Sequence, residues 1–137
     1  MKLVTYRDAG GRAHPGIMSG DHVIGLPITG IPDMVALASR GLRDMRAISG
    51  VALSHVELLA PIPRPPKFIC VGLNYRDHAI ESGQPVPERP TIFSKFSSCV
   101  IGPGAPIMLP RNSNQPDYEA EFAFVIGKGG RHIQPEN

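Results

Sequence analysis

Four of the six residues from Pro61 to Pro66 are proline, in the order Pro-Ile-Pro-Arg-Pro-Pro. Proline fixes φ and has no backbone N–H, so this stretch can form neither a helix interior nor a central strand. A stiff, extended connector is the expected structure. We therefore predict a small N-terminal domain over residues 1–62, a connector over residues 63–66 and the first part of a second domain over residues 67–137.

The N-terminal domain is predicted to be an antiparallel meander with a short helical segment. Turns rich in Gly and Asp separate three strand-like runs, which are residues 3–6, 14–18 and 22–26. Between residues 32 and 48 the apolar residues recur three and four apart, which predicts two short helices divided at Gly41. A further strand is expected at residues 56–59. This domain offers no evident chemistry. Its three histidines have no acidic residue at a useful spacing, and neither does one histidine of the second domain. We interpret all four as structural or exposed: His14, His22, His55 and His132.

The second domain is predicted to open with a buried strand at residues 67–72. Asn74 is a suitable helix N-cap, and Gly83 a suitable stop, for a helix from about Tyr75 to Ser82. Shorter strands are expected further along, at residues 91–95, 100–101 and 107–109. The longest strand signal begins at Asp117 and is nearly all apolar from residue 122, which is typical of a strand buried on both faces.

The composition favours a mainly β (α+β) fold and excludes several classes of function. Fifteen Gly and fifteen Pro residues indicate short strands joined by tight turns. A formal net charge of +2, with scattered basic residues, gives no nucleic-acid surface, and no apolar run is long enough for a membrane helix. Cys70 and Cys99 are interpreted as reduced and mostly buried. With no secretory signal visible, we expect a cytoplasmic protein.

Glu119 and Glu121 form the first candidate for chemistry. Alternate side chains of a strand share a face, so the two carboxylates would converge. Carboxylate oxygens suit a hard cation such as Mg²⁺. The alternative is a solvated polar face of a half-exposed strand. Asp117 could be a third ligand, or could cap the preceding loop.

His78 and Glu81 form the second candidate, because residues three apart on a helix are neighbours. A carboxylate that orients the imidazole would let it deprotonate a water molecule. An ordinary surface pair is the alternative. Lys95 could hold an anionic substrate, or could simply be solvated. Arg76 could bind a substrate carboxylate or pair with Asp77.

Four motifs in this order resemble the fumarylacetoacetate hydrolase (FAH) family: Val71–His78 with Glu81, Pro90–Lys95, Ile101–Gly104 and Asp117–Glu121. The resemblance implies a mixed β-sandwich or β-roll with few helices, usually in a homodimer. It implies that Glu119 and Glu121 bind Mg²⁺ or Mn²⁺ together with an aspartate beyond Asn137. This chain is then expected to be incomplete at the C-terminus, as the N-terminal portion of a longer enzyme.

The same resemblance assigns His78 and Glu81 to a catalytic dyad and Lys95 to the substrate's oxygens. It implies a metal-dependent hydrolase that cleaves C–C bonds of 2,4-dioxo acids, of the fumarylacetoacetate or acylpyruvate type. An isomerase or decarboxylase of 2-oxo acids in aromatic-compound catabolism, of the hydroxyhepta-dienedioate or oxaloacetate type, is the alternative. A second alternative is an inactive fragment that serves only as a binding module.

Overall fold

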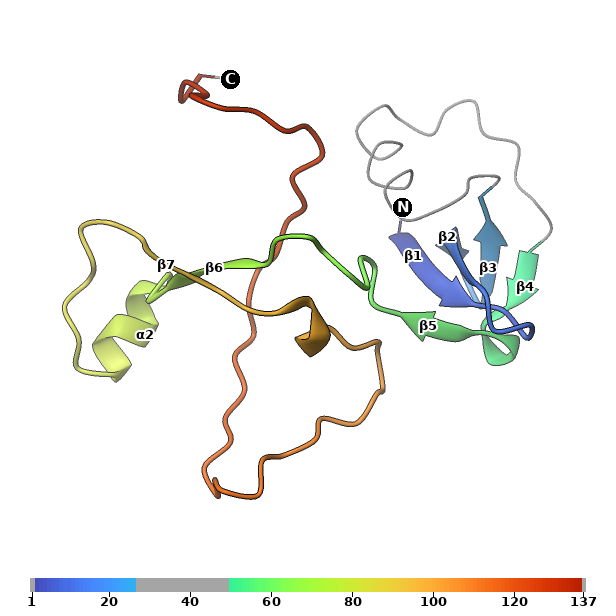
Figure 1. The fold of residues 1–137 in the computed structure, drawn as a ribbon, viewed down its shortest axis with the longest axis horizontal. Coiled ribbons are helices and arrows are strands. Elements are labelled where there is room, and N and C mark those ends of the chain that lie inside the picture. The colour runs from blue at the N-terminus through green and yellow to red at the C-terminus, as the bar shows by residue number, and fades with distance from the viewer. Residues whose placement is uncertain (1, 27–49, 137) are drawn as a thin grey trace. The chain divides into compact units, whose positions relative to one another are not determined.

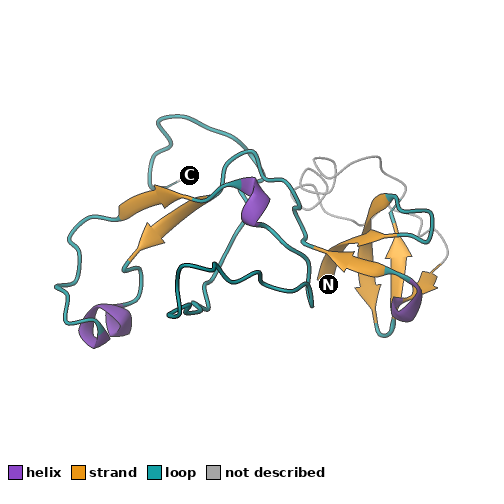
Figure 2. Cartoon of the chain, turned by 60° about the horizontal axis from the view of Figure 1, so that its bottom comes forward, coloured by secondary structure: helices purple, strands orange, loops and turns teal. Residues whose placement is uncertain are grey.

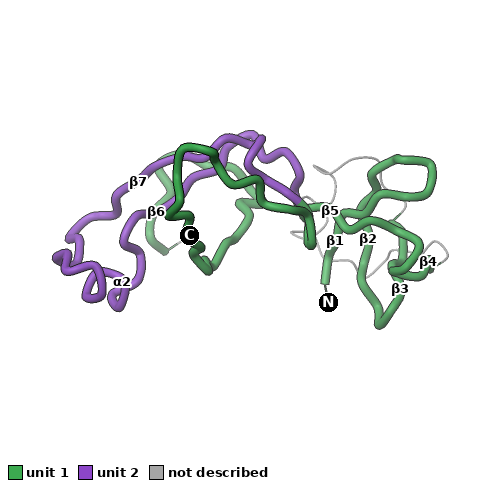
Figure 3. Tube along the Cα trace, turned by 90° about the horizontal axis from the view of Figure 1, so that it is seen from below, with its two compact units in different colours: residues 1–61, 102–137 green, residues 62–101 purple. Residues whose placement is uncertain are grey.

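The computed structural model of the chain describes residues 2–26 and 50–136, traced from end to end in Figure 1. The chain divides into two compact units, Met1–Pro61 with Gly102–Asn137, and Ile62–Ile101 (Figure 3). The predicted helices at residues 32–48 lie outside the described residues. Among those described, no helix is long and apolar enough to cross a membrane.

The first unit contains a five-stranded antiparallel sheet in the order β4-β3-β2-β1-β5. Its strands are β1 (Lys2–Arg7), β2 (Ala13–Ser19), β3 (His22–Gly25), β4 (Gly50–Ala52) and β5 (Glu57–Leu59), and the 3-10 helix η1 (Leu53–His55) connects β4 to β5. The predicted N-terminal meander and the predicted strand at residues 56–59 are both confirmed.

Two glycine-containing turns set the register of the first three strands. Between β1 and β2, the backbone N–H of Asp8 donates to the carbonyl of Arg12 at 2.9 Å, and Gly11 has a φ of 79°. Between β2 and β3, Ser19 pairs with His22 around a two-residue turn in which Gly20 has a φ of 59°. Positive φ favours glycine because it has no Cβ. The turn residues therefore explain why these strands pair as they do.

The core of the first unit lies under β1 to β3 and includes a buried hydroxyl. Its buried apolar side chains include Tyr6 on β1, Val23 on β3, and Leu26 and Ala60 just beyond β3 and β5. Thr5 is fully buried, and its hydroxyl donates to the carbonyl of Pro61 at 2.7 Å. This bond satisfies the polar group that burial would otherwise penalise, and it ties β1 to the chain just beyond β5.

The second unit is a β-hairpin with a helix in its long connection (Figure 2). Its elements are β6 (Ile69–Gly72), α2 (Arg76–Glu81), β7 (Thr91–Ser94) and the 3-10 helix η2 (Ser97–Cys99). The antiparallel register pairs Ile69 with Ser94 and Gly72 with Thr91. The connection that holds α2 therefore begins and ends at the same end of the hairpin.

Both ends of α2 lie one residue inside the predicted limits of Tyr75 and Ser82. The N-cap is Tyr75, which is extended (φ −108°, ψ 130°) and makes no side-chain capping bond, so Asn74 is not the cap. Leu73 has a φ of 48°, and this left-handed residue turns the chain before the helix can begin. At the other end, Gly83 has a φ of 66°, as expected of a glycine that terminates a helix.

Burial in the second unit is lower than predicted. The strand at residues 67–72 was expected to be buried, but Ile69 is 61% exposed. A two-stranded hairpin leaves most of its surface to solvent, and among the described residues no further strand flanks this one. Cys70 is half-buried and Cys99 is exposed, so the predicted burial of the cysteines is wrong for Cys99, although both are free thiols as expected.

Residues 102–136 form neither helices nor strands, and Figure 1 shows them as a long loop. The strands predicted at residues 100–101, at residues 107–109 and from Asp117 onward are therefore absent from the described chain. Tyr118 is 87% exposed and Phe122 82% exposed. A strand needs a neighbour for its backbone hydrogen bonds, and no described strand pairs with this segment. The mainly β architecture with few helices is nevertheless confirmed.

Candidate active site

The helix α2 carries three of the candidate residues. His78 and Glu81 lie three positions apart, which makes them neighbours on one face of the helix. Both are exposed, and within the described chain no hydrogen bond joins the two side chains. Ala79, in contrast, is fully buried and anchors the opposite side of α2. The helix therefore presents an imidazole and a carboxylate to solvent from a fixed base.

Lys95 directly follows β7, at the other end of the hairpin. Its backbone N–H donates to the carbonyl of Phe68 at 3.0 Å, which extends the β6–β7 pairing by one step. Four residues of strand separate it from Thr91, or about 13 Å at the usual rise. Since α2 leaves the hairpin at the end where Gly72 pairs with Thr91, the register separates Lys95 from that end. No described hydrogen bond or ion pair links its side chain to α2.

A cavity of about 350 Å³ lies between the end of β6, the turn into α2 and the loop before β7. Arg76 is the predicted site residue that lines it. The other polar side chains in the lining were not predicted as site residues, and they are Asn74, Glu88 and Arg89. Sequence reasoning passed over the loop at residues 84–90 because its prolines indicate only an irregular connection. The hairpin register is the signal that brings this loop beside Arg76.

Glu119 and Glu121 lie in the exposed segment that contains no strand. Carboxylate oxygens are the ligands that Mg²⁺ prefers, so these two residues fit a divalent cation in kind. They do not fit in number, since the described residues contain no group of three His, Cys, Asp or Glu side chains that could hold a metal ion. Asp117 accepts the backbone N–H of Tyr118 at 2.8 Å, which is a local turn contact. The two glutamates therefore offer part of a coordination shell.

Two histidine–carboxylate contacts in the first unit were missed by the sequence analysis. His14 Nε2 lies 2.8 Å from Asp8 Oδ2, and His22 Nδ1 lies 2.6 Å from Asp21 Oδ1. The prediction that His14 and His22 have no acidic partner is therefore wrong. For His14 the signal is the hairpin register, which places it opposite Tyr6 and so beside the turn that starts at Asp8.

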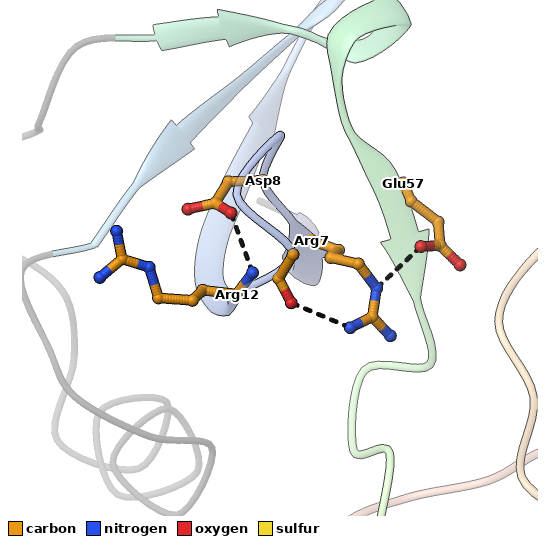
Figure 4. Close-up of polar contacts among 5 residues, drawn as sticks. Arg7, Asp8, Arg12 and Glu57 are labelled. Carbon is orange, nitrogen blue, oxygen red and sulfur yellow. Dashed lines mark hydrogen bonds and ion pairs between the residues drawn. The ribbon is translucent and has the colours of Figure 1, made fainter.

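The same hairpin carries further polar contacts (Figure 4). Arg7 Nε donates to Glu57 Oε2 at 2.8 Å, and its Nη1 donates to the carbonyl of Gly11. Burial, and secondarily the negative charge of Asp8, raises the pKa of Tyr6. These contacts tie β1 to β5 and brace the first turn, so they stabilise the sheet and lie outside the second unit.

Comparison with known proteins decides the family. The family described as "Fumarylacetoacetate (FAA) hydrolase C-terminal" matches residues 67–137, which include all six candidate site residues. The chain belongs to the fumarylacetoacetate hydrolase family. The resemblance seen in the sequence motifs is thus confirmed, and with it membership of a family of enzymes that act on small molecules.

One relative is the mitochondrial oxaloacetate tautomerase fahd2 of Xenopus laevis. It is 52% identical over 84 residues, which are 61% of this chain and 26% of that protein. This chain therefore spans about a quarter of the length of that relative. A tautomerase is an isomerase, so the relative supports the predicted isomerase alternative better than C–C hydrolysis. It also contradicts the predicted cytoplasmic location, because the matched protein is mitochondrial.

Two solved structures share the fold. A Mycobacterium smegmatis protein is 29% identical with a TM-score of 0.63, covering 80% of this chain and 41% of that one. The fumarylacetoacetate hydrolase of Exiguobacterium antarcticum is 27% identical with a TM-score of 0.52, covering 78% of this chain and 39% of that one. The FAH-type fold predicted from the sequence is therefore confirmed.

Proposed function

We propose that this chain carries proton-transfer and metal-binding residues of an enzyme that interconverts the keto and enol forms of oxaloacetate. The observation that supports this most is the 52% identity to an oxaloacetate tautomerase over 84 residues. The family match covers residues 67–137, a range that includes the candidate residues. The C–C hydrolysis favoured at first becomes the second candidate.

His78 is the proposed acid–base residue. Conversion of the keto form removes a proton from C3, and the electron pair moves to the oxygen on C2. An imidazole nitrogen of His78 accepts the C3 proton, and the resulting imidazolium returns a proton to the oxygen. Glu81, one turn along α2, favours the protonated imidazole through its negative charge. A positioned acid–base group of this kind contributes about 10²- to 10⁴-fold in rate.

Lys95 and the two glutamates have supporting roles in this proposal. The ammonium group of Lys95 donates a hydrogen bond to the C2 oxygen, where negative charge develops. Glu119 and Glu121 would supply two carboxylate ligands to a divalent cation, Mg²⁺ or Mn²⁺, with water and substrate oxygens among its remaining ligands. When bound, such a cation supplies Lewis-acid stabilisation of an enolate oxygen. Arg76, which lines the cavity beside α2, binds a substrate carboxylate.

Hydrolysis of a 2,4-dioxo acid remains the second candidate, because the family includes the Exiguobacterium antarcticum hydrolase of similar fold. In that reaction His78 would take a proton from a water molecule that attacks the distal carbonyl. The same residues act in both reactions, but His78 takes its proton from water in the hydrolysis and from C3 of the substrate in the tautomerisation. The two functions are therefore separated by substrate and product, and not by the identity of the site.

The test follows enol absorbance after oxaloacetate in its enol form is diluted into buffer with this chain and Mg²⁺. Faster decay than in the same buffer with Mg²⁺ and no protein, without added release of CO₂, is expected. Release of CO₂ would indicate a decarboxylase. Cleavage of acetylpyruvate to acetate and pyruvate, without faster enol decay of oxaloacetate, would indicate the hydrolase. An unchanged decay of both substrates would reject catalysis by this chain and favour a binding module.

We also propose the domain limits 1–62, 63–66 and 67–137, and assembly as a homodimer. The start of the family match at Lys67 supports the second limit. Limited proteolysis with trypsin is expected to cut first after Lys67, which is exposed at the end of the proline-rich connector, because the Arg64–Pro65 bond resists trypsin. Light scattering coupled to size exclusion tests the dimer, and a monomeric mass across the micromolar range would reject it.

A further inference from the structure

The cavity beside α2 brings two arginines together from separate parts of the second unit. Arg76 comes from α2, and Arg89 comes from the loop that leads into β7. The pairing of Gly72 with Thr91 brings the two ends of this connection side by side. The cavity volume, about 350 Å³, falls in the range of small-molecule sites.

The charges in the lining favour an anion. Arg76 and Arg89 contribute two guanidinium groups, and Glu88 contributes one carboxylate. Among the residues that the structure describes, none of these three groups is engaged in an ion pair. The side-chain amide of Asn74 adds a neutral hydrogen-bond donor. The cavity therefore keeps a net positive charge with its donors available.

The guanidinium groups of the two arginines favour a carboxylate as the bound anion. A guanidinium group is planar and offers parallel N–H donors, which match the two oxygens of a carboxylate. Oxaloacetate carries two carboxylates: one is attached to the C2 carbon that bears the reacting oxygen, and the other lies at C4. A site that selects such a dicarboxylate needs a second cationic group for the C4 carboxylate, whereas pyruvate would leave that group unpaired.

We propose that Arg76 and Arg89 each bind one carboxylate of a dicarboxylic 2-oxo acid, and that Arg89, at the far carboxylate, is a specificity-determining residue. This inference rests on the proposed function, and it adds the substrate class and a residue that the sequence motifs did not single out. The lone carboxylate of Glu88 limits the affinity, since it repels the same anion. A monocarboxylic 2-oxo acid leaves one guanidinium group unpaired, so it is expected to be a poor ligand.

The test measures binding and needs no turnover. Succinate, an unreactive dicarboxylate, and butyrate, a monocarboxylate of equal length, are titrated into the full chain by calorimetry. Succinate is expected to bind about tenfold more tightly, because it makes one more charge-assisted contact than butyrate does. Arg89→Gln and Arg76→Gln are expected to abolish that difference. Arg89→Lys keeps the charge without the planar fork, and an intermediate preference is expected.

Two further variants sharpen the result. Arg64→Gln removes an exposed arginine of the same unit that does not line the cavity, and it should leave the preference for succinate intact. Glu88→Gln should tighten succinate binding. The proposal is overturned if succinate and butyrate bind equally, if Arg89→Gln retains the preference, or if inorganic phosphate displaces succinate at equal concentration, which would show a general anion site.

The binding experiment and the enol-decay assay test the two proposals independently. Selective succinate binding without faster enol decay would reject the tautomerase and keep the dicarboxylate site. Faster enol decay with no preference for succinate would keep the tautomerase and reject the role of Arg89.

Discussion

His14 Nε2 lies 2.8 Å from Asp8 Oδ2, so the imidazole and the carboxylate face each other across the first hairpin turn. The backbone N–H of Arg12 also donates to Asp8, at 2.9 Å to Oδ1. The His14 ring also packs beside the Tyr6 ring, and their centroids are 5.6 Å apart. This one carboxylate therefore both closes the turn and holds a side chain of the neighbouring strand.

The first prediction concerns the pH dependence of stability. The N–H of Arg12, followed by the hydrogen bond to His14, lowers the pKa of Asp8 below its usual 3.8. Because the folded-state pKa is the lower one, the stabilisation is fully present above the unfolded value and is lost as pH falls through the folded value. Asp8→Asn is expected to unfold more easily at neutral pH and to lose less stability than the wild type on acidification.

Urea unfolding at pH values from about 6 to about 2 covers the window in which carboxylates titrate. Asp117→Asn is the matched control, since that exposed carboxylate accepts only a local N–H. If Asp8→Asn follows the wild type at every pH, the turn contact contributes nothing to stability. The hydrogen bond between Asp21 and His22 likewise lowers the pKa of Asp21. It accounts for part of any pH dependence of the free energy of unfolding that remains in Asp8→Asn.

A second prediction concerns the close packing at Gly16 in β2. A Cβ at this position would lie 2.7 Å from Val23 Cγ1 and 3.0 Å from the carbonyl oxygen of Ile24. Gly16→Ala should therefore lower the free energy of unfolding by about 1–3 kcal/mol. Gly50→Ala is the control in the same sheet, since its nearest atom would be 3.7 Å away. Equal stability of the two variants in a denaturant titration would contradict this packing.

A third prediction concerns the buried hydroxyl of Thr5. Thr5→Val keeps the shape of the side chain but removes the donor to the carbonyl of Pro61. A loss of about 0.5–1.5 kcal/mol in the free energy of unfolding is expected, because the hydrogen bond is lost while the carbonyl of the exposed Pro61 accepts from water instead. Thr91→Val, at an exposed strand position, should change the stability by less than about 0.5 kcal/mol. A smaller loss for Thr5→Val than for Thr91→Val would show that the bond is unimportant.

A fourth prediction addresses the metal ligands. Glu119→Gln and Glu121→Gln are each expected to weaken Mn²⁺ binding by about tenfold or more, since each removes a charged oxygen donor. Electron paramagnetic resonance of free Mn²⁺ measures this without substrate. Glu136→Gln, another exposed glutamate of the same segment, should bind Mn²⁺ as the wild type does. Unchanged binding in all three variants would remove Glu119 and Glu121 from the proposed site.

The first three strands of the N-terminal sheet were predictable because their signals are local, whereas β4 was not predicted. Gly11 and Gly20 mark turns that fix the register, and the apolar pattern between them fixes the strands. The Asp8–His14 contact was missed because it depends on that register rather than on sequence spacing. A strand from Asp117 was predicted from its apolar pattern alone. That pattern shows what a strand would bury, but the backbone partner that a strand requires is not found in the described chain.

The candidate site divides in the same way. The helix that carries His78 and Glu81 was predicted to within a residue at each end, because Gly83 is a strong local stop signal. The cavity that Arg76 shares with Arg89 was not predicted, since it arises from the long-range pairing of β6 with β7. The roles assigned to Lys95, Glu119 and Glu121 stay predictions that rest on the family motifs.

The most direct measurement of the proposed chemistry compares the wild-type chain, His78→Gln and His132→Gln in the enol-decay assay with oxaloacetate. His132 is an exposed histidine outside the proposed site, so the enol should decay with His132→Gln as fast as with the wild type. His78→Gln should slow the catalysed decay by about 10²-fold or more, because it removes the proton acceptor, while its Mn²⁺ binding stays intact. Catalysed decay by His78→Gln at the wild-type rate would contradict the account.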